Sequence, residues 1–517
     1  MLQRTATGTW MPAWVPESTV TLSVLLLICS MVQSCTGGYD GSMLNGLNIL
    51  DTYTNYFRLT PATTGLNTAS VFIGGFFGPI FSGVIADRLG RRPAILWGSL
   101  ITFVGILLQT AAQNIAMFVV ARIILGFGSA ISGIAGAVYL SETFPSRWRT
   151  WGVGLLNDFY YVGALLAAGI TLGTGRWQST WAWRAPSLFQ GIFSGLCILI
   201  LPFIPESPRW LVANGHTKEA RICLAQTNAS GDLSDPVVLA VYKEIVDTLR
   251  WEKEEKGVMT PLQIAKDPVA RKRLLVGMSA GPFSCIAGNI IASYYLGAEL
   301  DTAGITSYQD QLKANVVLNA WSLLTCLVGT HMCYKWGRKP TALVTQCLLV
   351  ACLFIIGGLS KVYADNPDGA SSSIIYGDVA VMFLFQGFYS VAWTPLLYLY
   401  PAEVMNYSIR ANGSAFSSFM LNALATLLVF VMPIGIANIG WKMYMINGGW
   451  DIIVVVLIAV YWVETKGKTL EEIDALFEGT KHSDVPDVEA VRSGKATLDV
   501  AGVEKELATE TVMMKTE

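Results

Sequence analysis

Long apolar runs separated by short polar loops make up most of the chain. Twelve of these runs approach or exceed the roughly 20 residues that an α-helix needs to cross the hydrocarbon core of a bilayer. The predicted spans are 20–46, 65–86, 93–113, 116–140, 150–172, 185–204, 274–297, 314–334, 340–360, 375–400, 409–432 and 439–462. The pattern predicts an all-α membrane protein with twelve transmembrane helices.

Composition supports this fold class. Of the 517 residues, 53% are hydrophobic and 14% are charged, whereas an ordinary soluble protein carries about 25% charged residues. The net charge of −2 gives no indication of a nucleic-acid partner. The three histidines and nine cysteines show no metal-ligand spacing, and the sequence contains no phosphate-binding loop. We therefore expect a protein that is not an enzyme and that uses no cofactor or metal.

Basic residues are concentrated in alternate loops, and such loops remain in the cytoplasm. The loop "DRLGRR" follows the second span, and the polar segment after the sixth span holds eleven basic residues. Both termini are therefore predicted to be cytoplasmic. The predicted division of the chain is an N-terminal tail (1–19), a six-helix bundle (20–204), a helical linker (205–273), a second six-helix bundle (274–464) and a C-terminal tail (465–517).

The two halves of the chain share three short motifs in the same order. The pairs are "DRLGRRP" with "YKWGRKP", "SETFPSRWR" with "PAEVMNYSIR", and "PESPRWL" with "VETKGKTLEE". Their equivalent topological positions and similar offsets indicate duplication of a six-helix unit. Two such halves related by an axis along the membrane normal form an established transporter architecture. We therefore expect two pseudo-symmetric six-helix bundles.

All three motifs are predicted to lie at cytoplasmic helix ends, where their charges can pair. A glutamate and an arginine flank the same turn in each half, Glu142 with Arg149 and Glu403 with Arg410. We interpret these charges as a latch that holds the cytoplasmic ends of the two bundles together in the outward-open state. The alternative is topogenic charge with exposed ion pairs worth about 0–1 kcal/mol each. The candidate gate residues are Asp87, Arg88, Arg91, Glu142, Arg149, Glu206, Arg209, Arg338, Glu403, Arg410 and Glu464.

An acidic residue, Asp40, lies near the end of the first apolar run, in "GGYDGSMLNGL". Ionisable residues at membrane depth are costly, and by default they are functional. Arg122 in the fourth span is the partner expected from its charge. Burial favours the protonated acid and a nearby guanidinium favours the ionised form, so a carboxylate between these influences can bind and release a proton. We interpret the two residues as a proton-coupling pair; a static ion pair or a helix cap is the alternative.

Several of these motifs resemble the sugar-porter family of the major facilitator superfamily. The matching segments are "GGYDGSMLNGL", "ADRLGRRP", "ARIILGFGSA", "YLSETFPSRWR", "PESPRWL", "YPAEVMNYSIRANG" and "ETKGKTLEE", in family order over nearly the whole chain. Two further phrases, "LLNDFYYVGALLAA" and "AWTPLLYLYPAEV", are most similar to the fungal lactose-permease and disaccharide (hexose) transporter branch. The resemblance implies a central cavity and transport by alternating access. It also implies an acid at the position of Asp40 in proton symporters, where facilitators have an amide.

The resemblance further implies a sugar site made of amides, hydroxyls and aromatic faces. The candidate substrate-binding residues are Asn157, Cys285, Asn289, Tyr294, Tyr295, Asn319, Trp393, Tyr398 and Asn422. Any one of them can equally bridge two helices. The chain departs from the family pattern in "FSCIAGN", where Cys285 and Ile286 stand at the positions of a glutamine and a tryptophan in the disaccharide branch. Tyr334 also replaces the usual aspartate of the second-half loop motif.

The expected function is proton-coupled symport of a sugar, either a disaccharide or a hexose. Cys285 and Ile286 remove polar and stacking groups from the expected site, so a polyol or a secondary metabolite is the alternative cargo. A third interpretation, a sugar receptor that does not transport, is disfavoured by the short C-terminal tail. The expected partners are a small-molecule sugar, protons and the lipid bilayer, with no nucleic acid. We expect a monomer in the plasma membrane.

Overall fold

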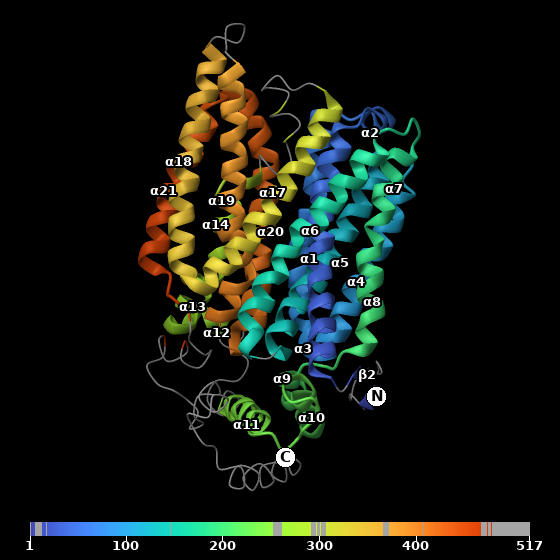
Figure 1. The fold of residues 1–517 in the computed structure, drawn as a ribbon, viewed down its shortest axis with the longest axis vertical. Coiled ribbons are helices and arrows are strands. Elements are labelled where there is room, and N and C mark those ends of the chain that lie inside the picture. Colours follow the sequence, from blue (N-terminus) through green and yellow to red (C-terminus); the bar gives the residue numbers. More distant parts are fainter. Residues whose placement is uncertain are drawn as a thin grey trace.

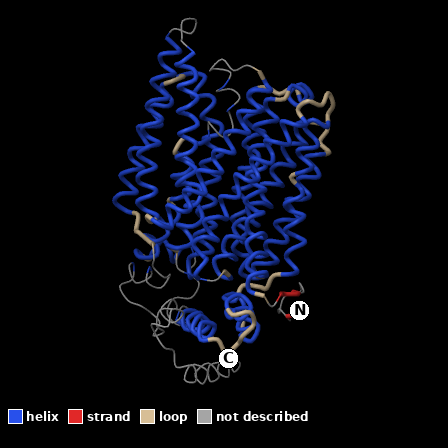
Figure 2. Tube along the Cα trace, viewed as in Figure 1, coloured by secondary structure: helices blue, strands red, loops and turns tan. Residues whose placement is uncertain are grey.

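The computed structural model describes residues 2–5, 13–16, 18–144, 146–251, 261–290, 307–365, 372–405 and 407–466, together with Leu296, Leu300, Ile473 and Phe477. These ranges are almost entirely helical, and long helices run side by side through the body of the molecule (Figure 2). Most of the predicted tails, 1–19 and 465–517, lies outside the described residues. The predicted all-α fold class is confirmed.

The first half of the chain forms one bundle, drawn from blue to green in Figure 1, which we call the N-terminal bundle. Its helices are α1 (Thr19–Ile49), α2 (Asp51–Phe57), α3 (Pro61–Leu89), α4 (Arg91–Thr110), α5 (Ile115–Thr143), α6 (Ser146–Thr174), α7 (Trp181–Phe189) and α8 (Gly191–Ile200). A 3₁₀ turn, η1 (Leu201–Phe203), follows α8. Together α7, α8 and η1 make one apolar segment long enough to span a membrane.

The second half forms a C-terminal bundle beside the first, drawn from green to red (Figure 1). Its helices are α13 (Pro268–Met278), α14 (Ala280–Ile286), α17 (Tyr308–Lys335), α18 (Arg338–Asp365), α19 (Ser372–Val404), α20 (Tyr407–Ile439) and α21 (Lys442–Tyr461). Over the ranges that the structure describes, eleven helical segments are long and apolar enough to cross a membrane. The two-bundle arrangement agrees with the duplication predicted from the motifs.

The seventh predicted span, 274–297, is not one continuous helix. It begins in α13, passes through the short α14 and reaches Gly288, which has a φ of +92°. A residue in this left-handed region ends a helix, and glycine adopts it without a steric penalty. Residues 291–295 of this span lie outside the described part of the chain.

Short helices between the bundles form a separate layer at one end of the molecule, which we call the linker end (Figure 1). They are α9 (Pro208–Ala213), α10 (Thr217–Asn228) and α11 (Pro236–Trp251), while α12 (Pro261–Lys266) packs against α13 at the base of the C-terminal bundle. A small core that includes Trp210, Leu224 and Tyr242 holds α9, α10 and α11 together. The antiparallel strands β1 (Leu2–Thr5) and β2 (Ala13–Pro16) lie at the same end. These short helices fall within the segment 205–273, which the sequence predicted as a linker.

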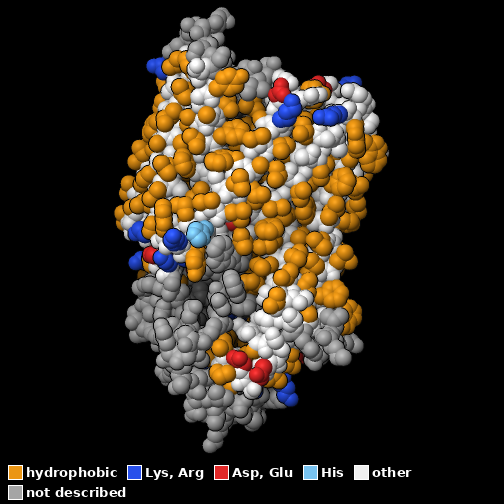
Figure 3. Space-filling view, viewed as in Figure 1, with side chains coloured by type: hydrophobic (Ala, Val, Ile, Leu, Met, Phe, Trp, Pro, Cys, Tyr) orange, Lys and Arg blue, Asp and Glu red, His pale blue; other side chains and the backbone are white. Residues whose placement is uncertain are grey.

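The bundles meet along two pairs of long helices, α3 with α20 and α6 with α17. Phe76 of α3 lies 4.3 Å from Phe419 of α20, measured between ring centroids. Apolar side chains cover the middle of the outer surface, and charged side chains gather towards its ends (Figure 3). This distribution is the one expected of a protein whose middle faces lipid.

Candidate transport cavity and coupling site

A cavity of about 280 Å³ lies between the two bundles. Helices α1, α3, α5 and α6 line it from the N-terminal bundle, and α14, α19 and α20 from the C-terminal bundle. Among the described residues that line it, Asp40 is the one charged side chain. The cavity is therefore large enough for a small molecule and favours a cargo without net charge of its own.

Asp40 and Arg122 form a two-point ion pair at the wall of this cavity. Arg122 Nη1 donates to Asp40 Oδ1 over 3.0 Å, and Nη2 donates to Oδ2 over 2.8 Å. Asp40 is 3% exposed and Arg122 is fully buried. The planar guanidinium matches both carboxylate oxygens, which is the strongest geometry available to such a pair. The pairing expected from the sequence is therefore present; its role in proton coupling remains a prediction.

Three further polar groups hold the pair in place. Gln190, at the junction of α7 and α8, donates its amide Nε2 to Asp40 Oδ1 over 3.2 Å. Arg122 Nε donates to the backbone oxygen of Asn67 over 3.1 Å and to Ser70 Oγ over 3.2 Å, both on α3. Arg122 therefore keeps two partners on α3 that do not depend on the charge of Asp40.

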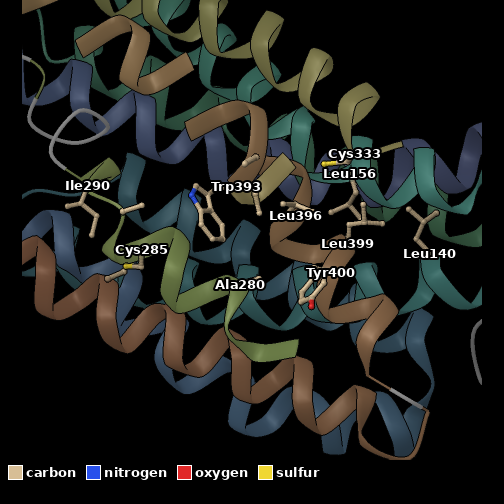
Figure 4. Close-up of a cluster of buried hydrophobic side chains, with 14 of the residues drawn as sticks. Leu140, Leu156, Ala280, Cys285, Ile290, Cys333, Trp393, Leu396, Leu399 and Tyr400 are labelled. Atoms are coloured by element: carbon tan, nitrogen blue, oxygen red, sulfur yellow. The ribbon is translucent and has the colours of Figure 1, made fainter. Parts of the chain in front are cut away.

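Most of the predicted substrate-binding residues reach the cavity. Those that line it are Asn157, Cys285, Asn289, Trp393, Tyr398 and Asn422. Figure 4 shows Trp393, Cys285 and Ile290 within a buried cluster that also includes Leu140 and Leu156 of the N-terminal bundle. The predicted residues Tyr294 and Tyr295 lie outside the described residues.

Several polar groups of the lining already bond to the protein. Asn157 Nδ2 donates to the backbone oxygen of Thr394 over 2.6 Å, which links α6 to α19 across the two bundles. Asn422 Nδ2 donates to the backbone oxygen of Ser418 over 2.7 Å. Asn157 therefore combines the two roles that the sequence left open, because it lines the cavity and also bridges two helices, whereas the Asn422 bond stays within α20.

Trp393 presents its ring to the cavity while its polar group points elsewhere. Its indole Nε1 donates to Gln346 Oε1 of α18 over 2.9 Å. The ring packs edge-to-face on Phe283 of α14, with 6.4 Å between ring centroids. Trp393 can therefore offer an apolar face to a cargo, but its N–H group is occupied.

Asn319 is not among the described residues that line the cavity, and its role in the substrate site stays a prediction. Its amide Nδ2 donates to Ser42 Oγ of α1 over 3.2 Å and to Asn315 Oδ1 over 3.0 Å. Asn315 Nδ2 also donates to Ser42 over 3.3 Å, and Asn45 Nδ2 donates to Asn315 over 3.4 Å. This polar network joins α1 to α17. The family resemblance made Asn319 a candidate, but only the packing of the bundles decides which neighbours it meets.

The first-half motifs converge at the linker end of the N-terminal bundle. Arg91 Nε donates to Glu142 Oε2 over 3.1 Å, and Arg91 Nη1 donates to Asp87 Oδ1 over 3.2 Å. The Glu206 carboxylate accepts from the backbone N–H groups of Arg91 and Arg92 over 3.0 and 3.2 Å. Burial raises the pKa of Glu206, against the opposing effect of the Arg92 charge. The start of α4 is thereby fixed to both α5 and the linker.

The second-half motifs repeat this arrangement. Arg338 Nε donates to Glu403 Oε2 over 2.9 Å. Glu464 accepts from the backbone N–H groups of Arg338 and Lys339, each over 3.0 Å. Tyr334, which stands where an aspartate was expected, is exposed. The internal repeat seen in the sequence is therefore also a repeat of contacts, except at this position.

The described ion pairs among the candidate gate residues lie within one bundle each, and a latch between the two bundles stays a prediction. Arg91 and Glu142 both belong to the N-terminal bundle, and Arg338 and Glu403 both belong to the C-terminal bundle. Each pair therefore stiffens one bundle. Of the other candidate gate residues, Asp87 pairs with Arg91 on the same side of the interface, Arg88 is exposed on α3, and Arg209 lies on α9. The side chains of Arg149 and Arg410 lie outside the described residues.

Two buried acids that the sequence interpretation passed over lie inside membrane-length helices. Asp158 on α6 and Asp451 on α21 are both fully buried. Neither carboxylate oxygen of Asp451 has a hydrogen-bond partner in the described structure. An acid within an apolar run, as in "LLNDFYYVG" and "GGWDIIVVV", is the signal that would have found them.

Two bundles around a central cavity define a multi-pass membrane transporter. The chain matches the family described as "Sugar (and other) transporter" over residues 26–477 and belongs to that family. It is 30% identical to the MFS glucose transporter mfs1 of Aspergillus flavus, over 85% of this chain and 87% of that protein. It is 29% identical to the MFS-type transporter oryC of Aspergillus oryzae, over 91% of this chain and 86% of the other.

The fold is also similar to solved structures. The proton:xylose symporter XylE bound to 6-bromo-6-deoxy-D-glucose gives a TM-score of 0.77 at 20% identity, with 89% of this chain and 100% of that chain covered. An inward-open form of the same xylose transporter from E. coli gives a TM-score of 0.64. These similarities establish the twelve-helix fold of the major facilitator superfamily, which the sequence predicted.

Proposed function

We propose that this protein is a proton-coupled sugar symporter in which Asp40 carries the proton. The observation that carries the proposal is the buried pair of Asp40 and Arg122 at the wall of the cavity. Family membership supports the transport of a sugar, and the relatives named as a glucose transporter and a proton:xylose symporter support both sugar and proton. A buried acid beside the cargo site is the group that a symporter needs.

The contacts of Asp40 and Arg122 predict how the pair responds when Asp40 binds a proton. In the described state the guanidinium of Arg122 stabilises the ionised carboxylate. When Asp40 takes up a proton from the cavity, its attraction for Arg122 falls, and Arg122 retains Asn67 and Ser70 on α3. The carboxyl group can then separate from α5, while Arg122 Nε keeps its two hydrogen bonds to α3. Proton binding thereby loosens α1 from α5 within the N-terminal bundle.

A second candidate cargo is a less polar small molecule. Cys285, not a glutamine, lines the cavity, and the indole N–H of Trp393 is occupied by Gln346. Both features reduce the hydrogen-bonding capacity of the C-terminal wall. A relative named only as an MFS-type transporter is consistent with a family whose description includes other cargoes.

We further propose the cellular arrangement that the sequence predicted. Basic loops place the linker end in the cytoplasm, so both termini are cytoplasmic, and the protein is a monomer in the plasma membrane. The domains are the bundles 20–204 and 274–464, the linker 205–273 and two tails. The paired charges at the linker end keep each bundle rigid while the bundles rock about the cavity.

Uptake into lipid vesicles tests the proposal. Purified protein is reconstituted, an inward proton gradient is applied, and labelled glucose, xylose, lactose and glycerol are offered in turn. Wild-type protein should accumulate one of these against its gradient. Asp40→Asn should abolish accumulation while sparing exchange, and Asp378→Asn, an acid on α19 that does not line the cavity, should leave accumulation intact. Unchanged accumulation by Asp40→Asn would contradict the coupling role.

A further inference from the structure

Asp158 lies in the contact between the two bundles, on the opposite side of α6 from the cargo. It is fully buried and does not line the cavity, although its neighbour Asn157 does. Its Oδ2 accepts a hydrogen bond from Thr330 Oγ1 of α17 over 2.6 Å. Its other oxygen, Oδ1, has no partner in the described structure. A membrane-buried carboxyl group is thus bonded across the bundle interface by the hydroxyl of Thr330, with the Cys326 thiol beside it.

No positive charge stabilises this group within the described residues. The ion pairs there include Asp40 with Arg122 and Glu403 with Arg338, but none involves Asp158. A hydroxyl and a thiol do not replace the hydration of a carboxylate, so the neutral acid is strongly favoured at such a site. The neutral form can share the short contact with Thr330 as donor or acceptor.

The side chains that face Asp158 on the neighbouring helices also favour its neutral form. On α17 they are Thr330 and the thiols of Cys326 and Cys333. On α1, the Cys35 thiol donates to the backbone oxygen of Phe159 over 3.2 Å. The part of α19 that meets this stretch contributes Ser390, which bonds Tyr161, and Thr394, which bonds Asn157. These are hydroxyls, thiols and a phenol, and they carry no charge at neutral pH.

We propose that Asp158 is a second proton-binding site, which holds its proton while α6 and α17 are in contact and releases it when they separate. Separation of the two helices breaks the bond to Thr330 and admits water, which stabilises the ionised form. The proton therefore stabilises the closed contact between the bundles. The site senses the movement of the bundles and needs no contact with cargo. Proton binding at Asp158 also does not depend on Asp40 acting as the coupling group.

The first test is the infrared spectrum of the purified protein in lipid vesicles at neutral pH. A protonated carboxyl group has a C=O stretching band that a carboxylate lacks. Asp158→Asn should remove one such band from the wild-type spectrum. Thr330→Val, which keeps the shape of the side chain but loses the hydroxyl, should shift the same band. A wild-type band pattern that both variants leave unchanged would overturn the proposal, because Asp158 would then be ionised.

The second test uses a native thiol as the reporter of helix separation. Cys326 is fully buried where α6 meets α17, against Tyr161 and Ala164. Its alkylation by N-ethylmaleimide, followed by mass spectrometry, measures how often the contact opens. For each pH, the rate is divided by that of the same thiol in unfolded protein, which removes the effect of thiol ionisation. The corrected rate should rise several-fold from mildly acidic to mildly alkaline pH in the wild type.

Three variants make the second test specific. Asp158→Asn should abolish the pH dependence, because the amide cannot release a proton. Asp378→Asn should retain it, since its Ser360 partner lies in the same bundle. Asp40→Asn should also retain it, which separates this inference from the proposed coupling role. The same pH dependence in Asp158→Asn as in the wild type would overturn the proposal, even if the infrared band is lost.

Discussion

Glu206 and Glu464 occupy equivalent positions in the two halves of the protein. Each carboxylate accepts hydrogen bonds from the first two backbone N–H groups of a helix, α4 for Glu206 and α18 for Glu464. The glycine before each helix has a positive φ, +103° at Gly90 and +113° at Gly337. Both glutamates come from the segment that follows the last helix of their own bundle. The duplication has therefore preserved a complete helix-capping unit.

This equivalence predicts similar costs for the two capping substitutions. Glu206→Ala and Glu464→Ala each leave two N–H groups at a helix start without their acceptor, at a cost of about 1–3 kcal/mol per site. Thermal unfolding in detergent should show comparable losses for both. Asp310→Ala serves as the control, because its pair with Lys313 is exposed and should contribute almost nothing. A loss confined to one half would show that the two units are not energetically equivalent.

The ion pair in the N-terminal bundle predicts unequal effects for its two partners. Arg122→Leu leaves the buried Asp40 carboxylate with Gln190 alone, and removing one member of a buried pair costs about 3–5 kcal/mol. Asp40→Asn should cost less, since Arg122 keeps Asn67 and Ser70. Unfolding temperatures of the two purified variants measure the difference. Equal destabilisation would mean that the α3 partners do not support the arginine.

Two glycines on α6 allow a test of how much folding depends on the close packing between α1 and α6. A side chain at Gly163 would collide with the backbone oxygen of Cys35, whereas a side chain at Gly169 would meet nothing within 4 Å. Gly163→Ala should sharply reduce the yield of folded protein. Gly169→Ala should be neutral or slightly stabilising, because alanine is the better helix former by about 1 kcal/mol. Size-exclusion profiles of the two variants provide the comparison, and identical profiles would contradict it.

The network of Asn319, Asn315 and Ser42 predicts effects on the rate of transport without effects on selectivity. Asn319→Ala removes bonds between α17 and α1 but no part of the cavity wall. The ratio of uptake rates for two competing sugars should stay constant while both rates change. Asn422→Ala, in the cavity lining, should change the ratio. A change in ratio for Asn319→Ala would place this residue in the substrate site.

Cys285 provides the test of cargo class. A glutamine at this position reaches into the cavity and restores the hydrogen-bonding capacity that the sequence lacks there. Cys285→Gln should therefore increase uptake of lactose or glucose several-fold relative to the wild type. The control is Cys285→Ser, in which a hydroxyl of similar size replaces the thiol. Cys333→Gln would not serve, because Cys333 is fully buried and a glutamine there would disturb the packing. No gain with any sugar would favour the less polar cargo.

The fold could be predicted from the sequence because a membrane-spanning helix depends only on the residues of its own stretch of chain. A stretch of about 20 apolar residues has few alternatives to a membrane-spanning helix. Duplicated motifs then grouped the helices into two bundles. The broken segment around Gly288 escaped this reasoning, since hydropathy does not register where a helix ends inside an apolar run.

The site was predicted only in part. Charge alone identified the partner of Asp40, because a buried acid and a buried base inside the membrane each need an opposite charge nearby. Charge did not identify Gln190 or Ser70, since neutral polar residues occur on many helix faces. Asp158 was visible as an acid in an apolar run, but its bond to Thr330 joins residues far apart in the sequence.

The sequence by itself determined the membrane class, the two-fold repeat and the identity of the residues able to carry charge. These properties depend on composition and on spacing along one helix. The tertiary structure alone decided which charges meet and on which side of the bundle interface they lie. It paired Arg91 with Glu142 inside one bundle and Arg338 with Glu403 inside the other, and it bonded Asn319 to Ser42 across the interface. The reason is physical: a helix face has a fixed direction, but its neighbour is chosen by the packing of the whole bundle.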